Sequence, residues 1–244
     1  MPTARRRRLL RAASLPAAYW GALALLVRPA YIATEFVVAA ATNGGYSFLA
    51  DSVSRLGEVG CSAAYCSPRH EVMSWSSIGF GALLAGGAVL LRRALGPWVT
   101  GLLAISGLSS AATGLAPLDQ DPALHALAAA PLFVAQPVAL VVLGARLRHV
   151  RPRLSRAILA TGVVAGMAAV AFVLSSDGPT SGALERLALW PVLVGLAAFA
   201  CTLVSTDDRS GPGGVSAGTT PPRAADAAGG LSGEVAIQPQ TPAG

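Results

Sequence analysis

Long apolar stretches alternate with short polar breaks along most of the chain. A helix needs roughly 20 mostly apolar residues to cross the hydrocarbon core of a bilayer, which is about 30 Å thick. The pattern therefore predicts an all-α, polytopic membrane protein built as a six-helix transmembrane bundle. The predicted spans are 17–41, 72–91, 97–116, 123–144, 156–176 and 184–204.

The breaks between the spans carry the turn signals of helix ends. Gly96 and Pro97 separate the second span from the third. Asp121 stands where an N-cap is expected for the fourth span, and Pro122 follows at its first helical position. Pro29 removes a backbone hydrogen bond inside the first span, which predicts a kink there.

The composition excludes the soluble classes of protein. Hydrophobic residues make up 53% of the 244 residues and charged residues only 12%, whereas soluble domains average about 25% charged residues. A soluble fold would lack the polar residues needed to cover its surface. Small residues are frequent in 72–91 and 97–116, which predicts that these spans pack closely against neighbouring helices.

The arginines set the expected orientation. They concentrate in the segment before the first span, in 92–93, in 146–156 and after the last span, which places these segments in the cytoplasm. The net charge of +6 is thus a topology signal, and nucleic-acid binding is excluded. We expect a plasma-membrane protein with both termini cytoplasmic.

Three regions follow from this orientation. Residues 1–16 form a basic cytoplasmic N-terminus, and 17–204 form the six-span membrane domain with an outer loop at 43–71. Residues 205–244 are rich in Gly, Pro, Ala, Ser and Thr without periodicity, which predicts a disordered cytoplasmic tail. The first span is too long and too interrupted for a cleaved signal peptide, so a signal anchor is expected.

The outer loop contains a predicted short helix and a pair of cysteines. Residues 46–57 read as an amphipathic helix ended by Gly57, with Asp51 and Ser54 as neighbours on one face. Cys61 and Cys66 lie on the oxidising side of the membrane, where a disulfide is the preferred interpretation. Metal binding by this pair alone is a weaker alternative, because no second pair of ligands stands nearby.

Several short motifs lie in a defined order relative to the predicted spans. They are Gly45-Tyr-Ser47, Asp51-Ser-Val-Ser54-Arg-Leu-Gly57, Cys66-Ser-Pro-Arg-His70, Val72-Met73, Gly114-Leu-Ala-Pro-Leu-Asp119, His125 and Glu185-Arg-Leu-Ala-Leu-Trp-Pro191. On these motifs, the chain from about Tyr31 to Leu203 resembles the bacterial and archaeal membrane proteins grouped as domain of unknown function 998. The resemblance implies a six-helix membrane fold and supplies no activity.

The chain departs from the pattern of this family at two positions. Arg55 stands where the family usually has an acidic residue, and Ser74 stands where it often has asparagine. Any role that needs a carboxylate at the first position does not carry over to this chain.

Polar residues gather at the outer ends of the predicted spans. One reading is a metal-dependent hydrolase facing the outer leaflet, with zinc held by His70, His125 and Asp119, and with Ser54 as a further catalytic candidate. The other reading is that these side chains close the end of the helical bundle. The gathered residues are Asp51, Ser54, His70, Asp119, His125, Asp177, Glu185 and Arg186.

Two charged residues stand inside the first span. An arginine at the centre of a membrane helix costs roughly 2.5–3.5 kcal/mol by translocon scales. Arg28 and Glu35 share one helix face but are separated by about 10 Å along the axis, so each is expected to meet a partner on another helix or a water-filled cavity.

The leading hypothesis is a non-enzymatic membrane protein whose outward-facing polar pocket binds a lipid or a small amphiphile. The alternatives are the zinc hydrolase and, ranked lower, a small proton-coupled carrier acting through Glu35. No cofactor is expected outside the hydrolase reading, membrane lipids are the expected partners, and homo-oligomerisation stays open. The ligand-binding candidates are Asp51, Arg28, Glu35, Glu185 and Arg186.

Overall fold

The computed structural model describes residues 16–175 and 178–207. Nearly all of the basic N-terminal segment, Asp177 and nearly all of the predicted tail lie outside the described residues. The described part is helical, and six of its helices are long and apolar enough to cross a membrane. The fold class predicted from the hydrophobic pattern is confirmed.

The six spans are formed by seven of the described helices, because the first span is broken in two. The first span consists of α2 and α3, and a short helix, α5, precedes the third. The elements are α2 (Pro16–Leu26), α3 (Ala30–Ala39), the 3-10 helix η2 (Val53–Gly57), α4 (His70–Leu90), α5 (Arg92–Leu95), α6 (Pro97–Leu115), α7 (Pro122–Leu147), α8 (Pro152–Leu174) and α9 (Ser181–Asp207).

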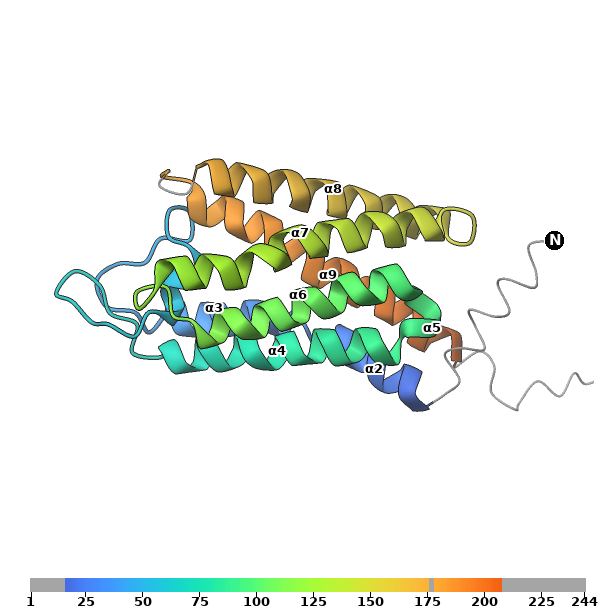
Figure 1. Ribbon diagram of the computed structural model, residues 1–244, viewed down its shortest axis with the longest axis horizontal. Helices are drawn as coiled ribbons and strands as arrows, with labels where there is room; N and C mark the ends of the chain where they lie inside the picture. The colour runs from blue at the N-terminus through green and yellow to red at the C-terminus, as the bar shows by residue number, and fades with distance from the viewer. Residues whose placement is uncertain (1–15, 176–177, 208–244) are drawn as a thin grey trace, which may run out of the picture. The chain divides into compact units, whose positions relative to one another are not determined.

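The long helices pack in the order of the sequence. The first span lies against α4, α4 against α6, α6 against α7, α7 against α8 and α8 against α9 (Figure 1). The last helix, α9, returns to pack against α2, which closes the ring. A core of buried aliphatic side chains, among them Leu25, Leu84, Leu103, Leu140 and Leu196, fills its centre.

The break in the first span lies where Pro29 predicts a kink. The N–H of Val27 donates to the carbonyl of Leu23 over 3.1 Å, but the N–H of Arg28 bonds to the carbonyl of Leu25, one residue closer. The chain therefore leaves the α-helical pattern before Pro29 and resumes it at Ala30. The break places Arg28 between two half-helices in the middle of the span.

Two glycines bring α4 and α6 into backbone contact. A Cβ atom placed on Gly81 would lie only 2.5 Å from the carbonyl oxygen of Gly107. A Cβ atom on Gly107 would clash in the same way with the carbonyl oxygen of Gly81. The close packing predicted from the small residues of these spans is confirmed.

The segment between α3 and α4 crosses the end of the bundle where α4, α7 and α9 begin (Figure 1). Asn43 and Cys66 pair their backbones at its base, with N···O distances of 2.9 and 3.0 Å. Gly44, with φ of +94°, allows this approach, because a Cβ atom there would clash with the carbonyl of Ala64.

The helix predicted over 46–57 is wrong in its extent. Only Val53–Gly57 is helical, and it is a single 3-10 segment. The Asp51 carboxylate accepts from the N–H of Ser47 over 2.7 Å, and the hydroxyl of Ser52 caps the N–H of Arg55 over 3.3 Å. These side-chain bonds to the backbone replace the helical bonds that the amphipathic pattern favoured.

Candidate functional site

A cavity of about 70 Å³ lies inside the bundle, beneath η2. At roughly 10–15 Å³ for each water, this volume has room for about five to seven water molecules. Side chains from η2, the first span, α4, α6, α7 and α9 form its wall. The polar ones are Arg28, Tyr31, Ser54, Ser74, Ser77, Ser110, Thr113, His125, Gln136 and Glu185.

Arg28 contributes an unpaired charge to this cavity. The residue is 3% exposed, and its Nε and Nη1 atoms are buried without a hydrogen-bond partner among the described residues. A buried charge without a partner is costly, and a buried donor is normally satisfied by protein, water or ligand. Arg28 therefore lines the cavity with two donor atoms that the described residues leave unsatisfied.

Three polar side chains meet at the end of the cavity that lies under the loop. Nε2 of His125 lies 2.9 Å from Oγ of Ser54, which is 3.4 Å from Oε1 of Glu185. Nδ1 of His125 lies 2.6 Å from the carbonyl oxygen of Ala116. Each residue comes from a different element, namely α7, η2 and α9, so the tertiary fold assembles this group.

Glu185 also holds η2 in place. Its Oε2 accepts from the backbone N–H of Val53 over 2.6 Å, at the first residue of the 3-10 helix. A carboxylate at this end satisfies an N–H that has no partner within the helix. The bond positions the neighbouring Ser54 in the cavity wall.

Glu35 and Arg186 form a second buried group, outside the cavity wall. Nε of Arg186 donates to Oε1 of Glu35 over 2.6 Å, and Nε1 of Trp190 donates to Oε2 of Glu35 over 2.9 Å. Nη1 of Arg186 also donates to the carbonyls of Phe48 and Asp51 over 2.7 and 2.9 Å. This network satisfies both charges and fastens the loop to the helices.

Tyr46 completes this second group. Its hydroxyl donates to the carbonyl of Ser52 over 2.9 Å and accepts from Nη2 of Arg186. Burial raises the pKa of Tyr46, so the hydroxyl keeps the proton that it donates. The structure thus gives Glu35 and Arg186 the paired role that sequence reasoning left open.

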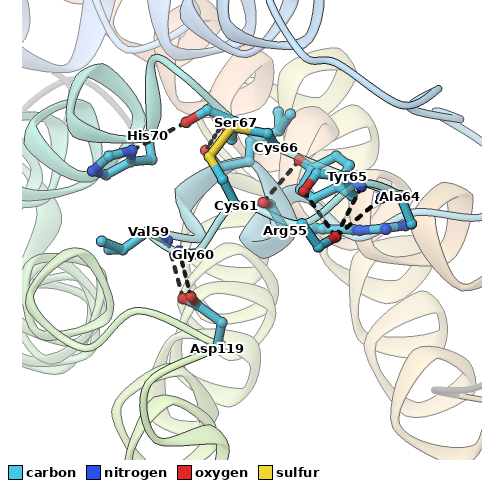
Figure 2. The surroundings of a disulfide bond; sticks show 12 residues. Arg55, Val59, Gly60, Cys61, Ala64, Tyr65, Cys66, Ser67, His70 and Asp119 are labelled. Carbon is cyan, nitrogen blue, oxygen red and sulfur yellow. Dashed lines mark hydrogen bonds between the residues drawn. A yellow bond between two sulfur atoms is a disulfide. The ribbon is translucent and has the colours of Figure 1, made fainter.

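The residues proposed as zinc ligands lie in separate hydrogen-bonded groups. Asp119 accepts from the N–H groups of Val59 and Gly60 over 3.1 and 2.7 Å, and His70 bonds through Nδ1 to the carbonyl of Ser67 (Figure 2). His125 bonds to Ala116 and Ser54, as described above. Across 16–175 and 178–207, no group of three or more His, Cys, Asp or Glu side chains is placed to hold a metal ion.

Cys61 and Cys66 form a disulfide in the outer part of the loop (Figure 2). The hydroxyl of Tyr65 donates to the carbonyl of Arg55 over 3.0 Å, and Oγ of Ser67 donates to the carbonyl of Leu56 over 2.8 Å. Burial raises the pKa of Tyr65 to about 12, so this donor keeps its proton. These bonds fix the disulfide-closed loop onto η2.

Asp51 pairs with Arg55 rather than with a residue of the cavity wall. Arg55 is thus the charged partner of Asp51 in this chain. Asp51 therefore stabilises the loop, by pairing with Arg55 and by accepting from the N–H of Ser47.

Sequence reasoning missed part of the cavity wall. Gln136 is 4% exposed in the middle of an apolar span, and Tyr31 and Ser77 share a contact of 3.5 Å between their hydroxyl oxygens. A polar residue inside a membrane helix is itself a signal, because it is costly unless it faces the bundle interior. Gln136 was recognisable on that ground, whereas Tyr31 and Ser77 needed the fold.

Residues 25–202 match the family described as Protein of unknown function (DUF998), and the chain belongs to this family. The resemblance drawn from the loop and span motifs is therefore confirmed. No curated protein and no solved structure matches the chain.

Proposed function

We propose that this member of the DUF998 family binds an amphiphile that carries one oxyanion group of the carboxylate, phosphate or sulfonate type. The anionic group enters the cavity and pairs with Arg28. The protein performs no reaction on this ligand, which fits a sensor, a chaperone for amphiphiles or a subunit of a larger membrane assembly.

The unpaired guanidinium of Arg28 carries this proposal. Guanidinium groups bind oxyanions through charge-assisted hydrogen bonds, and Nε and Nη1 are the two Arg28 atoms without a partner in the described residues. The remainder of the wall offers hydroxyls and an amide, which bind the outer oxygens of such a group. A neutral or cationic headgroup would leave the charge of Arg28 uncompensated.

The apolar part of the wall supports an amphiphile over a free inorganic ion. Phe80, Leu132, Phe133, Leu189 and Leu193 line the same cavity. Apolar surface gains about 25 cal/mol for each Å² removed from water, so an alkyl chain attached to the anion adds affinity there. Inorganic phosphate would use the same polar groups and gain nothing from this apolar surface.

We place the protein in the plasma membrane with the loop of η2 on the outer side. The arginines of 92–93 and 146–156 lie at the opposite end of the spans, which the positive-inside rule assigns to the cytoplasm. The ligand then reaches the cavity from the outer leaflet.

The test is calorimetric titration of the protein in phosphatidylcholine nanodiscs with octanesulfonate, and separately with inorganic phosphate. We expect octanesulfonate to bind and the Arg28→Gln variant to lose at least tenfold in affinity. Arg69→Gln is the matched control, because Arg69 is exposed and lies outside the cavity. Equal affinity for octanesulfonate in the parent and Arg28→Gln would refute the proposal. If inorganic phosphate binds as tightly as octanesulfonate, the ligand is an anion that needs no apolar chain.

A second candidate function rests on the 2.9 Å contact between Ser54 and His125. This distance suits a nucleophile and its general base, and Ala116 orients the ring. Ser54 Oγ would attack the carbonyl of an ester amphiphile and pass its proton to Nε2 of His125, which returns it to the departing alcohol. Water would then hydrolyse the acyl-serine.

A fluorophosphonate probe separates this candidate from the first. Labelling of the parent that disappears in Ser54→Ala and His125→Gln would support a serine hydrolase. Absence of labelling in the folded parent would leave the binding function alone.

A further inference from the structure

The hydroxyl of Ser54 lies between an imidazole nitrogen and a carboxylate in the cavity wall. Its Oγ is 2.9 Å from Nε2 of His125 and 3.4 Å from Oε1 of Glu185. A serine hydroxyl has a single proton to donate. It therefore cannot serve a bare imidazole nitrogen and a carboxylate at the same time.

The other ring nitrogen of His125 limits where the protons shared by His125, Ser54 and Glu185 can lie. Nδ1 faces the carbonyl oxygen of Ala116 at 2.6 Å, and because a carbonyl only accepts, Nδ1 carries a proton. With Nδ1 protonated, two placements of the remaining protons make both contacts of Ser54 hydrogen bonds. Either Nε2 is also protonated and Ser54 donates to Glu185, or Glu185 is protonated and Ser54 donates to Nε2.

Both arrangements contain one proton more than a neutral imidazole beside a carboxylate. We infer that His125, Ser54 and Glu185 form a proton site coupled to the anion site at Arg28, so that the protein takes up one proton with the anion that it binds. This inference rests on the proposed function and adds the proton as a second ligand of the same cavity.

Charge balance inside the cavity supplies the coupling. With its proton, the group of His125, Ser54 and Glu185 is neutral overall, and Arg28 gives the cavity a net positive charge that attracts a monoanion. Without the proton, the group is negative and offsets Arg28. Charges interact strongly at the low effective dielectric of a buried site, so the unprotonated group weakens anion binding.

The other groups around Glu185 leave this balance in place. On α9, Arg186 is already paired with Glu35 of α3. The first span presents Arg28 and Tyr31 to the cavity, α7 presents His125, and η2 presents Ser54. The polar groups that α4 and α6 contribute are hydroxyls that do not titrate in the relevant range: Ser74, Ser77, Ser110 and Thr113.

The test measures octanesulfonate binding between about pH 6 and about pH 9, a range in which a sulfonate stays anionic. We expect the parent to lose up to about tenfold in affinity for each pH unit above the titration of the group, as one coupled proton requires. A pH indicator in weak buffer should record proton uptake on binding. Glu185→Gln should bind with constant affinity, because its amide accepts from Val53, donates to Ser54 and does not titrate.

Three outcomes overturn the inference. Constant affinity in the parent without proton uptake, together with loss of binding in Arg28→Gln, removes the proton site and preserves the proposed function. Proton uptake that persists in Glu185→Gln assigns it to other groups. No octanesulfonate binding at any pH overturns the proposed function together with the inference. Should Glu185→Gln fail to fold, the presence or absence of proton uptake by the parent on binding supports or overturns the proton site.

Discussion

Arg186 donates through Nε to Oε1 of Glu35 over 2.6 Å, across 151 positions of the chain. The pair joins the last span to the second half of the first, and both side chains are almost fully buried. Trp190 and the loop carbonyls of Phe48 and Asp51 supply the remaining hydrogen bonds. The lower-ranked hypothesis of a carrier that moves protons through Glu35 receives no support from a carboxylate held in this way.

Removal of one member of this pair should destabilise the protein. We expect Arg186→Met to lower the free energy of unfolding by about 3–5 kcal/mol, because it leaves the Glu35 carboxylate buried without its charge partner. The double variant Glu35→Leu with Arg186→Met should recover most of the loss. Thermal unfolding in detergent and the monodisperse fraction on size exclusion are the measurements, with Arg69→Met as control.

A different result would change the role given to the pair. If Arg186→Met unfolds at the temperature of the parent, the pair does not stabilise the fold. If the double variant is no better than the single one, the loss comes from the other bonds of Arg186 rather than from the charge of Glu35.

The hydrophobic pattern was sufficient to predict the six spans, the kink at Pro29 and the cap at Asp121, which accepts from the N–H of Leu124 over 2.9 Å. These features depend on residues within a few positions of one another. The axial separation of about 10 Å was also sufficient to predict that Arg28 and Glu35 do not pair with each other. The partner of Glu35 was not predictable, because it is set by how α3 and α9 pack.

The candidate site was predictable as a set of residues and not as an arrangement. Ser54, His125 and Glu185 were all in the polar set at one end of the spans, and the structure brings these three together. His70 and Asp119 were in the same set, yet they bond to nearby backbone groups instead. Hydrophobic periodicity fixes the depth of a residue in the membrane and gives no position around the bundle.

The buried charge of Arg28 should lower the free energy of unfolding of the ligand-free protein, and a bound anion should restore it. We expect Arg28→Met to raise the free energy of unfolding of ligand-free protein by about 1–4 kcal/mol, the range seen when buried ion pairs are replaced by apolar residues of similar volume. The same variant should gain no thermal stability from octanesulfonate, whereas the parent should. A variant that unfolds more readily than the parent would show that Arg28 has a structural partner in the folded protein.

The contact between α4 and α6 should not tolerate a larger side chain. Gly107→Leu places a side chain against the backbone of Gly81, and we expect a loss of at least about 1–3 kcal/mol, the usual cost of overpacking. Gly101→Leu is the matched control on the same helix, because a Cβ atom at Gly101 meets no other atom within 4 Å. Equal unfolding temperatures for the two variants would contradict the backbone contact.

The disulfide of the loop allows a direct test of the orientation. If the loop faces outward, a membrane-impermeant phosphine followed by an impermeant maleimide should label Cys61 and Cys66 on intact cells, because the loop segment that carries them is exposed. The variant with Cys61→Ser and Cys66→Ser should take no label from the same treatment. A reporter fused after Val204 should then read cytoplasmic, since an even number of spans returns the chain to its starting side. Label that appears only after the cells are lysed, together with an external reporter, would reverse the orientation and place the loop and η2 on the cytoplasmic side.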